Sequence, residues 1–254
     1  MATPIIMAAF GTTSKALATY DHIDARVKKK FPGHDVYWAY SSRMVKDFIK
    51  KKKDIDLKHP HQVLAELNEK GEKWAVVQSM HLIGGHEFFR LVNEVDESDV
   101  RASVGLPLLS SPDDFTRTVK ALEETIINGK EEAIVFVGHG TDHMAWSSYP
   151  ALAHVLQSTY GNRVFVGVVE GGPEAEDIAE KVRSKGYRKA RIVPFMLVAG
   201  VHFYEDLASD DEDSWKRIFE AKGISVVLEN EGVGYNDRIT DIFCDHISAA
   251  LAMI

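Results

Sequence analysis

The sequence contains one cysteine, Cys244, in 254 residues. A single cysteine cannot form a disulfide within the chain or build a thiolate cluster, so a metal site would have to use histidine and carboxylate ligands. No stretch reaches the roughly 18 apolar residues of a membrane-spanning helix. The opening residues, MATPIIMAAFG, also lack the basic start and the cleavage site of an export signal. We therefore expect a cytoplasmic protein without a membrane partner, although an exported form stays open if a longer precursor is trimmed before Met1.

Positive charge is also scarce, because 30 basic residues face 38 acidic ones and the formal net charge is -8. A general nucleic-acid-binding protein would show a basic face, so we expect no nucleic-acid partner. The chain also lacks a GxSxG nucleophile elbow, a phosphate-binding GKS motif and an EF-hand loop. The 45% of hydrophobic residues is ordinary for a soluble globular protein, and the length suits one large domain or two of about 125 residues.

Three segments of the first half of the chain resemble three segments of the second half, in the same order. The pairs are IIMAAFGTT with IVFVGHGTD, HDVYWAYSS with RVFVGVVEG, and KGEKWAVVQSMHLIGGHEFF with KGYRKARIVPFMLVAGVHFY. One such match can arise by chance between apolar strands, but three in register indicate an internal duplication. The first pair places Gly11 over Gly140. It also places Phe10 over His139.

Each half alternates strand and helix patterns, which predicts an α/β fold of two similar, doubly wound parallel sheets with helices on both faces. Strands are expected near 4–10, 35–40, 74–80, 102–106, 133–138, 163–169, 190–198 and 224–229. A helix should begin after Ser111 as N-cap, with Pro112 in its first turn, and end at Gly129. We expect an N-terminal half at 1–129 and a C-terminal half at 130–254, whose last helix, about 236–252, could pack on the first half.

In the second half, three apolar strands lead to residues that can bind a metal. His139 follows VFVG, Glu170 ends VFVGVVE, and His202 closes PFMLVAGVH. The carboxyl ends of parallel strands line one crevice, where ligands bind. Two imidazoles and a carboxylate suit a divalent first-row metal and leave positions for another ligand. The structural alternatives are buried histidines bonded to backbone carbonyls and, for Glu170, a partner of a helix N-terminus.

The matching strand end of the first half carries His81 and His86 in SMHLIGGHEFF. We expect these residues to line a ligand crevice, with His81 as a polar contact to the ligand, although a core histidine with its polar atoms satisfied is an equally good interpretation of each. His143 lies four residues after His139, but the missing HExxH pattern makes it a weak candidate.

An anion could bind where the first strand passes into a helix, in AFGTTSKA. Free backbone N–H groups and hydroxyls at a helix N-terminus attract negative charge. A plain helix cap is the alternative. Arg43, just past the second strand, is placed to meet an acidic ligand. The candidate substrate-binding residues are Gly11, Thr12, Thr13, Ser14, Arg43 and His81.

On these residues the chain resembles the class II tetrapyrrole chelatases, and among them the anaerobic sirohydrochlorin cobaltochelatases of the CbiK type. The likeness covers nearly the whole chain. It includes the opening FGT, QSMHLIGGHEF, GLPLLSSPDD, the GHG and VEG segments, and PFMLVAGVH followed by DLASDDEDSWK. The resemblance implies two α/β halves facing across a cleft, with Co2+ held at His139, Glu170 and His202. It also implies that His139 acts as the base that removes pyrrole protons, and whether it binds metal and takes protons at different stages is a hypothesis.

The resemblance further implies an enzyme that inserts Co2+ into the acidic tetrapyrrole sirohydrochlorin in cobalamin biosynthesis, with no organic cofactor. Fe2+ or Ni2+ as the inserted metal stays open, because the same ligand set accepts several metals. So does a non-catalytic tetrapyrrole, haem or metal carrier, in which His81 or His86 would be candidate axial ligands. A sugar- or amino-acid-binding protein of two lobes is disfavoured by the clustered His and Glu residues. Assembly into a homo-oligomer also stays open.

Overall fold

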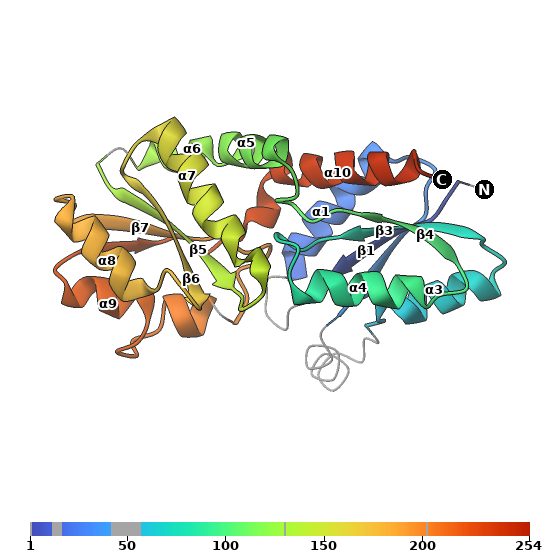
Figure 1. Cartoon of the computed structure of the whole chain (residues 1–254), viewed down its shortest axis with the longest axis horizontal. Coiled ribbons are helices and arrows are strands. Elements are labelled where there is room, and N and C mark those ends of the chain that lie inside the picture. Colours follow the sequence, from blue (N-terminus) through green and yellow to red (C-terminus); the bar gives the residue numbers. More distant parts are fainter. Residues whose placement is uncertain (1, 12–16, 42–56, 130, 202) are drawn as a thin grey trace. The chain divides into compact units, whose positions relative to one another are not determined.

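A computed structural model describes residues 2–11, 17–41, 57–129, 131–201 and 203–254. In this part of the chain the strands form two parallel sheets of four strands each (Figure 1). The first sheet contains β1 (Ile5–Ala9), β2 (Val36–Tyr40), β3 (Trp74–Ser79) and β4 (Arg101–Gly105). The second contains β5 (Ala133–Gly140), β6 (Val164–Glu170), β7 (Lys189–Pro194) and β8 (Ser225–Leu228). Every strand expected from the sequence is therefore present.

The two sheets have the same topology. Their strand orders are β2-β1-β3-β4 and β6-β5-β7-β8, and neighbouring strands are parallel. In each sheet the first strand of the unit, β1 or β5, lies between the second and the third strand, so β1 and β5 are in equivalent places. Strand β1 is almost fully buried, as is β5 up to Gly138, which explains their continuous runs of apolar residues. The expected fold class, two similar parallel α/β halves, is confirmed.

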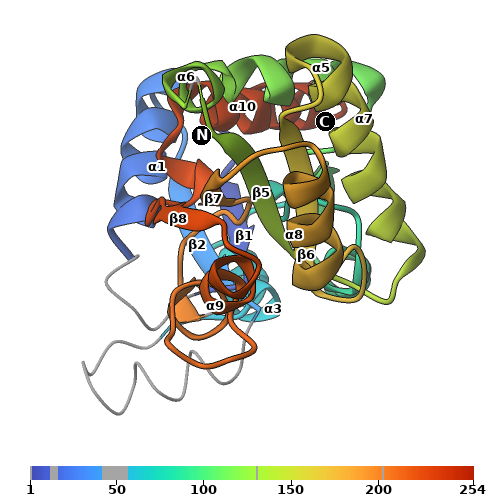
Figure 2. The same ribbon diagram turned by 90° about the vertical axis from the view of Figure 1, so that its left-hand side faces the viewer.

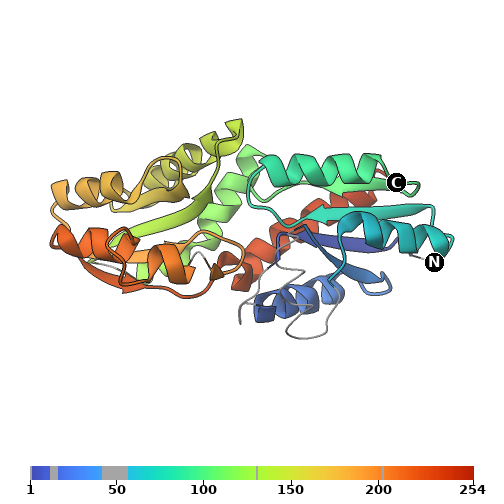
Figure 3. The same ribbon diagram turned by 90° about the horizontal axis from the view of Figure 1, so that it is seen from below.

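Helices cover both faces of the first sheet. On one face lie α3 (Pro60–Glu69) and α4 (His86–Asp96), which are in front of the sheet in Figure 3. On the other lie α1 (Leu17–Lys30) and α10 (Asp237–Leu251), where α10 contacts β3 and β4. The core on the α3–α4 side includes Ile6, Leu64, Val77 and Leu91, each at most 3% exposed.

The second sheet is covered in the same manner (Figure 2). One face carries α5 (Pro112–Ala121), α6 (Glu123–Asn128) and α7 (Ser148–Tyr160), and the other carries α8 (Ala175–Ser184) and α9 (Trp215–Ala221). Short helical turns occur at Met144–Ser147, Phe203–Leu207 and Val233–Tyr235. The core under α8 and α9 is built from Val135, Ile178 and Phe219 among others. Among the described residues, no helix is long and apolar enough to cross a membrane.

The chain divides into two compact units, Met1–Ser110 with Asn236–Ile254, and Ser111–Tyr235. The division therefore falls at Ser111, whereas the sequence placed it at Gly129. The physical reason is that the segment between these positions is tied to the second unit. Helix α5 packs on α7, and the Arg163 guanidinium donates to the carbonyls of Ile126 and Gly129 at 2.6 Å each.

The helix in this segment begins as the sequence indicates, because the Ser111 hydroxyl accepts a hydrogen bond from the Asp114 N–H and Pro112 occupies the first turn. It does not run unbroken to Gly129. Helix α5 ends at Ala121 and α6 starts at Glu123, so the expected single helix is two shorter ones.

Helix α10 is attached to the first unit by ion pairs to α1. The Arg26 guanidinium donates to both carboxylate oxygens of Asp241, at 3.0 Å from Nε and 2.6 Å from Nη2, and to Asp237 at 2.8 Å. The His22 ring lies 2.9 Å from the same Asp237. A bidentate pair fixes both distance and orientation, so it sets the position of α10 on α1. Through these ion pairs the last helix of the chain contacts α1, which precedes it by more than two hundred residues in the sequence.

We predict that Arg26→Met lowers the free energy of unfolding of the first unit by about 1 kcal/mol, because the pair is bidentate but partly exposed. Urea denaturation would measure this, and amide exchange should speed up in α10. The matched control is Lys28→Met, which removes an ion pair to Asp24 within α1 alone. It should cost less than about 0.5 kcal/mol. Equal effects of the two variants would show that Arg26 does not hold α10 in place.

Candidate metal site

The two predicted metal ligands His139 and Glu170 lie at the carboxyl ends of neighbouring strands. Strands β5 and β6 are paired so that Gly140 is in register with Glu170. The His139 Nδ1 atom lies 3.9 Å from the Glu170 Oε2 atom. Both side chains are accessible, with exposed fractions of 46% and 63%. Parallel pairing has therefore brought together two residues that are far apart in the sequence.

A glycine makes this close approach possible. Gly140 has a φ of +93°, and a Cβ at this position would lie 1.8 Å from the Glu170 carbonyl oxygen. Any other residue would both strain the backbone and push β6 away. The glycine after His139 in the sequence is thus required by the spacing of the two strands.

A buried tyrosine, Tyr149, supports the same turn. The Tyr149 ring, 4% exposed, occupies the space next to Gly138, where a Cβ would lie 2.2 Å from the ring. Its hydroxyl accepts a hydrogen bond from the Gly140 N–H at 3.1 Å. Burial raises the pKa of Tyr149, so the hydroxyl stays protonated. The sequence analysis missed this residue.

Two acceptor groups lie beside Nδ1 of the His139 ring. Nδ1 lies 3.3 Å from the Gly140 carbonyl oxygen as well as 3.9 Å from the Glu170 carboxylate. Both neighbours are acceptors, which favours a proton on Nδ1 and puts the basic lone pair on Nε2. A neutral imidazole in this form can bind a metal or accept a proton through Nε2.

Glu170 differs from another carboxylate of this sheet, which is buried and paired with cations. Glu132, at the opposite end of β5, is paired with Lys189 at 2.6 Å and with Arg191 at 3.0 Å. Although burial alone would raise it, hydrogen bonds from these two cations hold the pKa of Glu132 below its ordinary value. Within the described part of the chain, no lysine or arginine reaches Glu170, and the side chain beside it is that of His139. The Glu170 carboxylate therefore has no lysine or arginine partner among these residues and can offer its oxygens to a metal ion.

The third predicted ligand, His202, lies outside the described residues. The chain that leads towards it leaves β7, which flanks β5 on the side opposite β6. That segment is held by backbone hydrogen bonds from Val233 to Met196 at 2.8 Å and from Gly234 to Leu197 at 2.9 Å. Among the residues that the structure describes, no group of three or more His, Cys, Asp or Glu side chains could hold a metal. Two of the three predicted ligands are thus brought together, and the third stays a prediction.

The predicted anion-binding turn is described only at its first residue. Gly11 follows β1 with a φ of +100°, the left-handed conformation that favours glycine. The remaining candidates of this group lie outside the described residues, namely Thr12, Thr13, Ser14 and Arg43. Their role as substrate contacts stays a prediction.

His81 lies in a buried polar cluster at the end of β3. Its Nδ1 atom is 2.9 Å from the Ser79 hydroxyl, and its Nε2 atom is buried without a hydrogen-bond partner in the described part of the chain. Burial, with a smaller contribution from the nearby positive charge of Arg90, lowers the pKa of His81 to about 4. The ring is therefore neutral at physiological pH. Its role as a ligand contact stays a prediction.

The other two histidines considered in the sequence, His86 and His143, have different surroundings. His86 is the first residue of α4 and is exposed. The His143 Nδ1 atom accepts a hydrogen bond from the Ala145 N–H at 3.1 Å and so caps the short helical turn that begins at Met144. His139 lies in a strand, so the two histidines do not share a helix, and the role that the structure shows for His143 is this cap.

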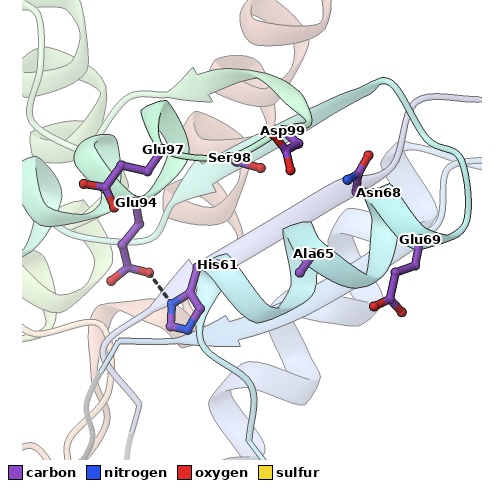
Figure 4. A pocket seen from close by; sticks show the side chains of 8 residues that line it. All are labelled: His61, Ala65, Asn68, Glu69, Glu94, Glu97, Ser98 and Asp99. Atoms are coloured by element: carbon purple, nitrogen blue, oxygen red, sulfur yellow. Dashed lines mark hydrogen bonds and ion pairs between the residues drawn. The ribbon is translucent and has the colours of Figure 1, made fainter.

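Two cavities lie away from these strand ends. One, of about 430 Å3, lies between α3 and α4, and Figure 4 shows its acidic lining, with the His61 ring 3.3 Å from Glu94. The other, of about 250 Å3, lies beside β6 between α7 and α8. None of the predicted site residues lines either cavity. The chemistry that the sequence predicts is therefore confined to the strand ends.

Comparison with known proteins gives a consistent result. The model of the cobalt chelatase (CbiK) family matches residues 3–252. The chain is 35% identical over 227 residues to the sirohydrochlorin cobaltochelatase of Salmonella typhimurium, which covers 87% of this chain and 85% of the relative. It is 33% identical over 261 residues to the sirohydrochlorin cobaltochelatase CbiKC of Nitratidesulfovibrio vulgaris, which covers 98% of this chain and 91% of the relative.

Solved structures share the fold. SirB from Bacillus subtilis with Fe3+ superposes with a TM-score of 0.68 at 16% identity, over 99% of this chain and 96% of that one. The structure of CbiX, described as the terminal enzyme of siroheme biosynthesis in denitrifying bacteria, gives a TM-score of 0.62 at 15% identity, over 97% and 99% of the two chains. At these identities the similarity shows the architecture alone.

A comparison of Gly140→Ala with a control should separate two effects of replacing this glycine, namely the strain of a positive φ and the clash of the added carbon with β6. The Gly161→Ala control also places alanine at a positive φ, of +81°, in a backbone region that glycine alone adopts readily, but the added carbon meets nothing within 4 Å. It should cost about 1–3 kcal/mol of stability. Gly140→Ala should cost at least about 2 kcal/mol more, because the added carbon must displace the β6 backbone. Urea denaturation of both variants measures the difference, and equal losses would contradict the close approach of the two strands.

The depressed pKa of His81 predicts a loss of stability in acid. The unfolded chain binds a proton at this residue below about pH 6.5, whereas the folded chain does so only near pH 4. The stabilisation is therefore complete above pH 6.5 and disappears as the pH falls towards 4. Between pH 6.5 and 4.5 it should decrease by about 2–3 kcal/mol. Urea denaturation of the wild type and of His81→Gln at pH 6.5 and pH 4.5 tests this. Between these two pH values, the free energy of unfolding should fall by about 2–3 kcal/mol less in the variant than in the wild type. Identical pH dependences would disprove the assignment.

Proposed function

The chain belongs to the cobalt chelatase (CbiK) family, and we propose that it is a sirohydrochlorin cobaltochelatase, which inserts Co2+ into sirohydrochlorin for anaerobic cobalamin biosynthesis. Two relatives named as sirohydrochlorin cobaltochelatases align with most of the chain, at 33% and 35% identity. The assignment of the substrate rests on these relatives. The assignment of the site rests on the geometry at the ends of β5 and β6.

The observation that carries the proposal is the 3.9 Å separation of the His139 Nδ1 and Glu170 Oε2 atoms. Nitrogen and oxygen ligands lie about 2.0–2.2 Å from a divalent first-row ion, so two ligand atoms of one ion lie at most about 4.2 Å apart. The two exposed side chains are already this close, and rotation of the His139 ring presents Nε2, the atom with the lone pair, to an ion bound at Glu170. We propose that His139 and Glu170 bind Co2+ together with His202.

This ligand set suits an ion that has to be released. Imidazole and carboxylate bind Co2+ without the strong affinity of thiolates, and a three-residue site leaves coordination positions for the pyrrole nitrogens of the substrate. As the ion enters the ring, two N–H bonds break and two protons leave, so the total charge is unchanged. His139 can accept a proton through Nε2 once its lone pair is not engaged by the metal. We therefore propose that His139 acts as ligand and as base at successive stages.

The acidic substrate needs local attraction from a protein that carries a formal charge of -8. We propose that Thr12, Thr13, Ser14 and Arg43 contribute to it, through backbone N–H groups, hydroxyls and one guanidinium, and that Gly11, without a side chain, lets the substrate approach the backbone. His81, which is neutral near pH 7, would add a polar contact to the ring rather than a charge.

The test is an anaerobic insertion assay with sirohydrochlorin and Co2+, followed by absorbance. His139→Ala should lower kcat/KM for insertion at least 100-fold, because it removes both a ligand and the base. Glu170→Gln should lower it at least about 10-fold through weaker Co2+ binding. Glu174→Gln, an exposed carboxylate at the start of α8, is the matched control and should behave as wild type.

Three outcomes would contradict the proposal. Full activity of His139→Ala would remove that residue from the site. Tight binding of sirohydrochlorin by the wild type without acceleration over the protein-free rate would make the chain a carrier. Faster insertion of Fe2+ or Ni2+ than of Co2+ would keep the mechanism and change the metal.

A further inference from the structure

The backbone that carries His139 is fixed from two sides. On one side, Gly140 pairs with Glu170 of β6. On the other, the Gly140 N–H donates to the Tyr149 hydroxyl, nine residues further along the chain and on the first turn of α7. The peptide between His139 and Gly140 is thus held between a strand and a side chain. Any freedom of this peptide would be transmitted directly to the direction of the His139 side chain.

The same contact occurs in the first unit at the same spacing. The Gly11 backbone N–H forms a hydrogen bond to the hydroxyl of Tyr20, which is 4% exposed, as Tyr149 is. Gly11 and Gly140 have similar φ values of +100° and +93°. In the internal alignment Tyr20 falls on Tyr149, just as Gly11 falls on Gly140. The residue before the glycine is Phe10 in one unit and His139 in the other, and both are exposed.

We propose that Tyr149 is a positioning residue for metal binding, which holds His139 at the distance from Glu170 that one Co2+ ion requires. The inference rests on the proposed function. Tyr149 touches neither the metal nor the substrate in this account, and it acts through the Gly140 N–H. The first unit has the same contact at the glycine that follows Phe10, so the contact itself is a feature of the fold that both units share. It influences metal affinity only where the residue before that glycine is a metal ligand.

Removal of the hydroxyl alone isolates this effect. In Tyr149→Phe the ring still fills the space beside Gly138, so the packing of α7 on β5 is kept. The Gly140 N–H loses its acceptor, and the turn can relax away from the position that suits Glu170. Outer groups that orient a metal ligand typically change metal affinity by 10- to 100-fold. Tyr20→Phe is the matched control, because it removes the equivalent hydroxyl from the unit that lacks His139.

The experiment is a calorimetric titration of each protein with Co2+ alone, under anaerobic conditions and without the tetrapyrrole. The proteins are wild type, Tyr149→Phe, Tyr20→Phe and His139→Ala. We expect the Kd for Co2+ to rise about 10-fold in Tyr149→Phe and to stay at the wild-type value in Tyr20→Phe, while the Tm falls by similar amounts in both. In the insertion assay, Tyr149→Phe should raise the KM for Co2+ and leave the KM for sirohydrochlorin unchanged.

The titration distinguishes failure of this inference from failure of the proposed function. If His139→Ala loses affinity but Tyr149→Phe binds Co2+ as wild type does, the positioning role is overturned and the metal site stands. If Tyr20→Phe weakens Co2+ binding as much as Tyr149→Phe, the effect is a general loss of stability and the inference also fails. If His139→Ala binds Co2+ as tightly as wild type, the proposed metal site itself falls, and the role of Tyr149 falls with it.

Discussion

The register between β5 and β6 is the constraint on which the site depends. Side chains alternate between the two faces of a strand, so a slip of one residue would turn every buried side chain of β6 from one face of the sheet to the other, against a different layer of helices. The register that buries Phe165, Val166 and Val168 is also the one that sets Glu170 opposite Gly140. The hydrophobic core therefore determines where the carboxylate emerges. Gly140 then allows the two backbones to approach closely enough for His139 and Glu170 to share an ion.

At the two ends of the second sheet a glutamate has two different roles, as part of a stabilising ion-pair network at one end and as part of the proposed metal site at the other. At the amino end, Glu132 is buried but compensated by Lys189 and Arg191, and Arg191 also pairs with Glu229. Such a network satisfies each charge internally and has nothing to offer a ligand. At the carboxyl end, Glu170 is exposed, and its partner His139 is itself able to leave the pair and bind a metal. Under the proposed function, the cation that completes the second arrangement comes from solution.

Much of this could be predicted from the sequence, because strand positions follow from local runs of apolar residues and ligands follow at strand ends. What could not be predicted depends on contacts between distant positions. The boundary at Ser111 rests on hydrogen bonds from Arg163 to the carbonyls of Ile126 and Gly129, and no local pattern reports them. Tyr149 was missed because a tyrosine in a helix usually indicates core packing. Its signal was present only as an equal glycine-to-tyrosine spacing in both halves.

The internal duplication separates scaffold from chemistry. Both units have the same strand order, the same left-handed glycine after the first strand and the same buried tyrosine hydroxyl on that glycine. These features are internal, and in each unit they support the glycine at the end of the first strand. The residue exposed just before the glycine differs, and it is phenylalanine in one unit and histidine in the other. Because the supporting contact was duplicated while the exposed residue was not, the metal ligand proposed for the second unit requires a change of side chain only, on a backbone already held in position.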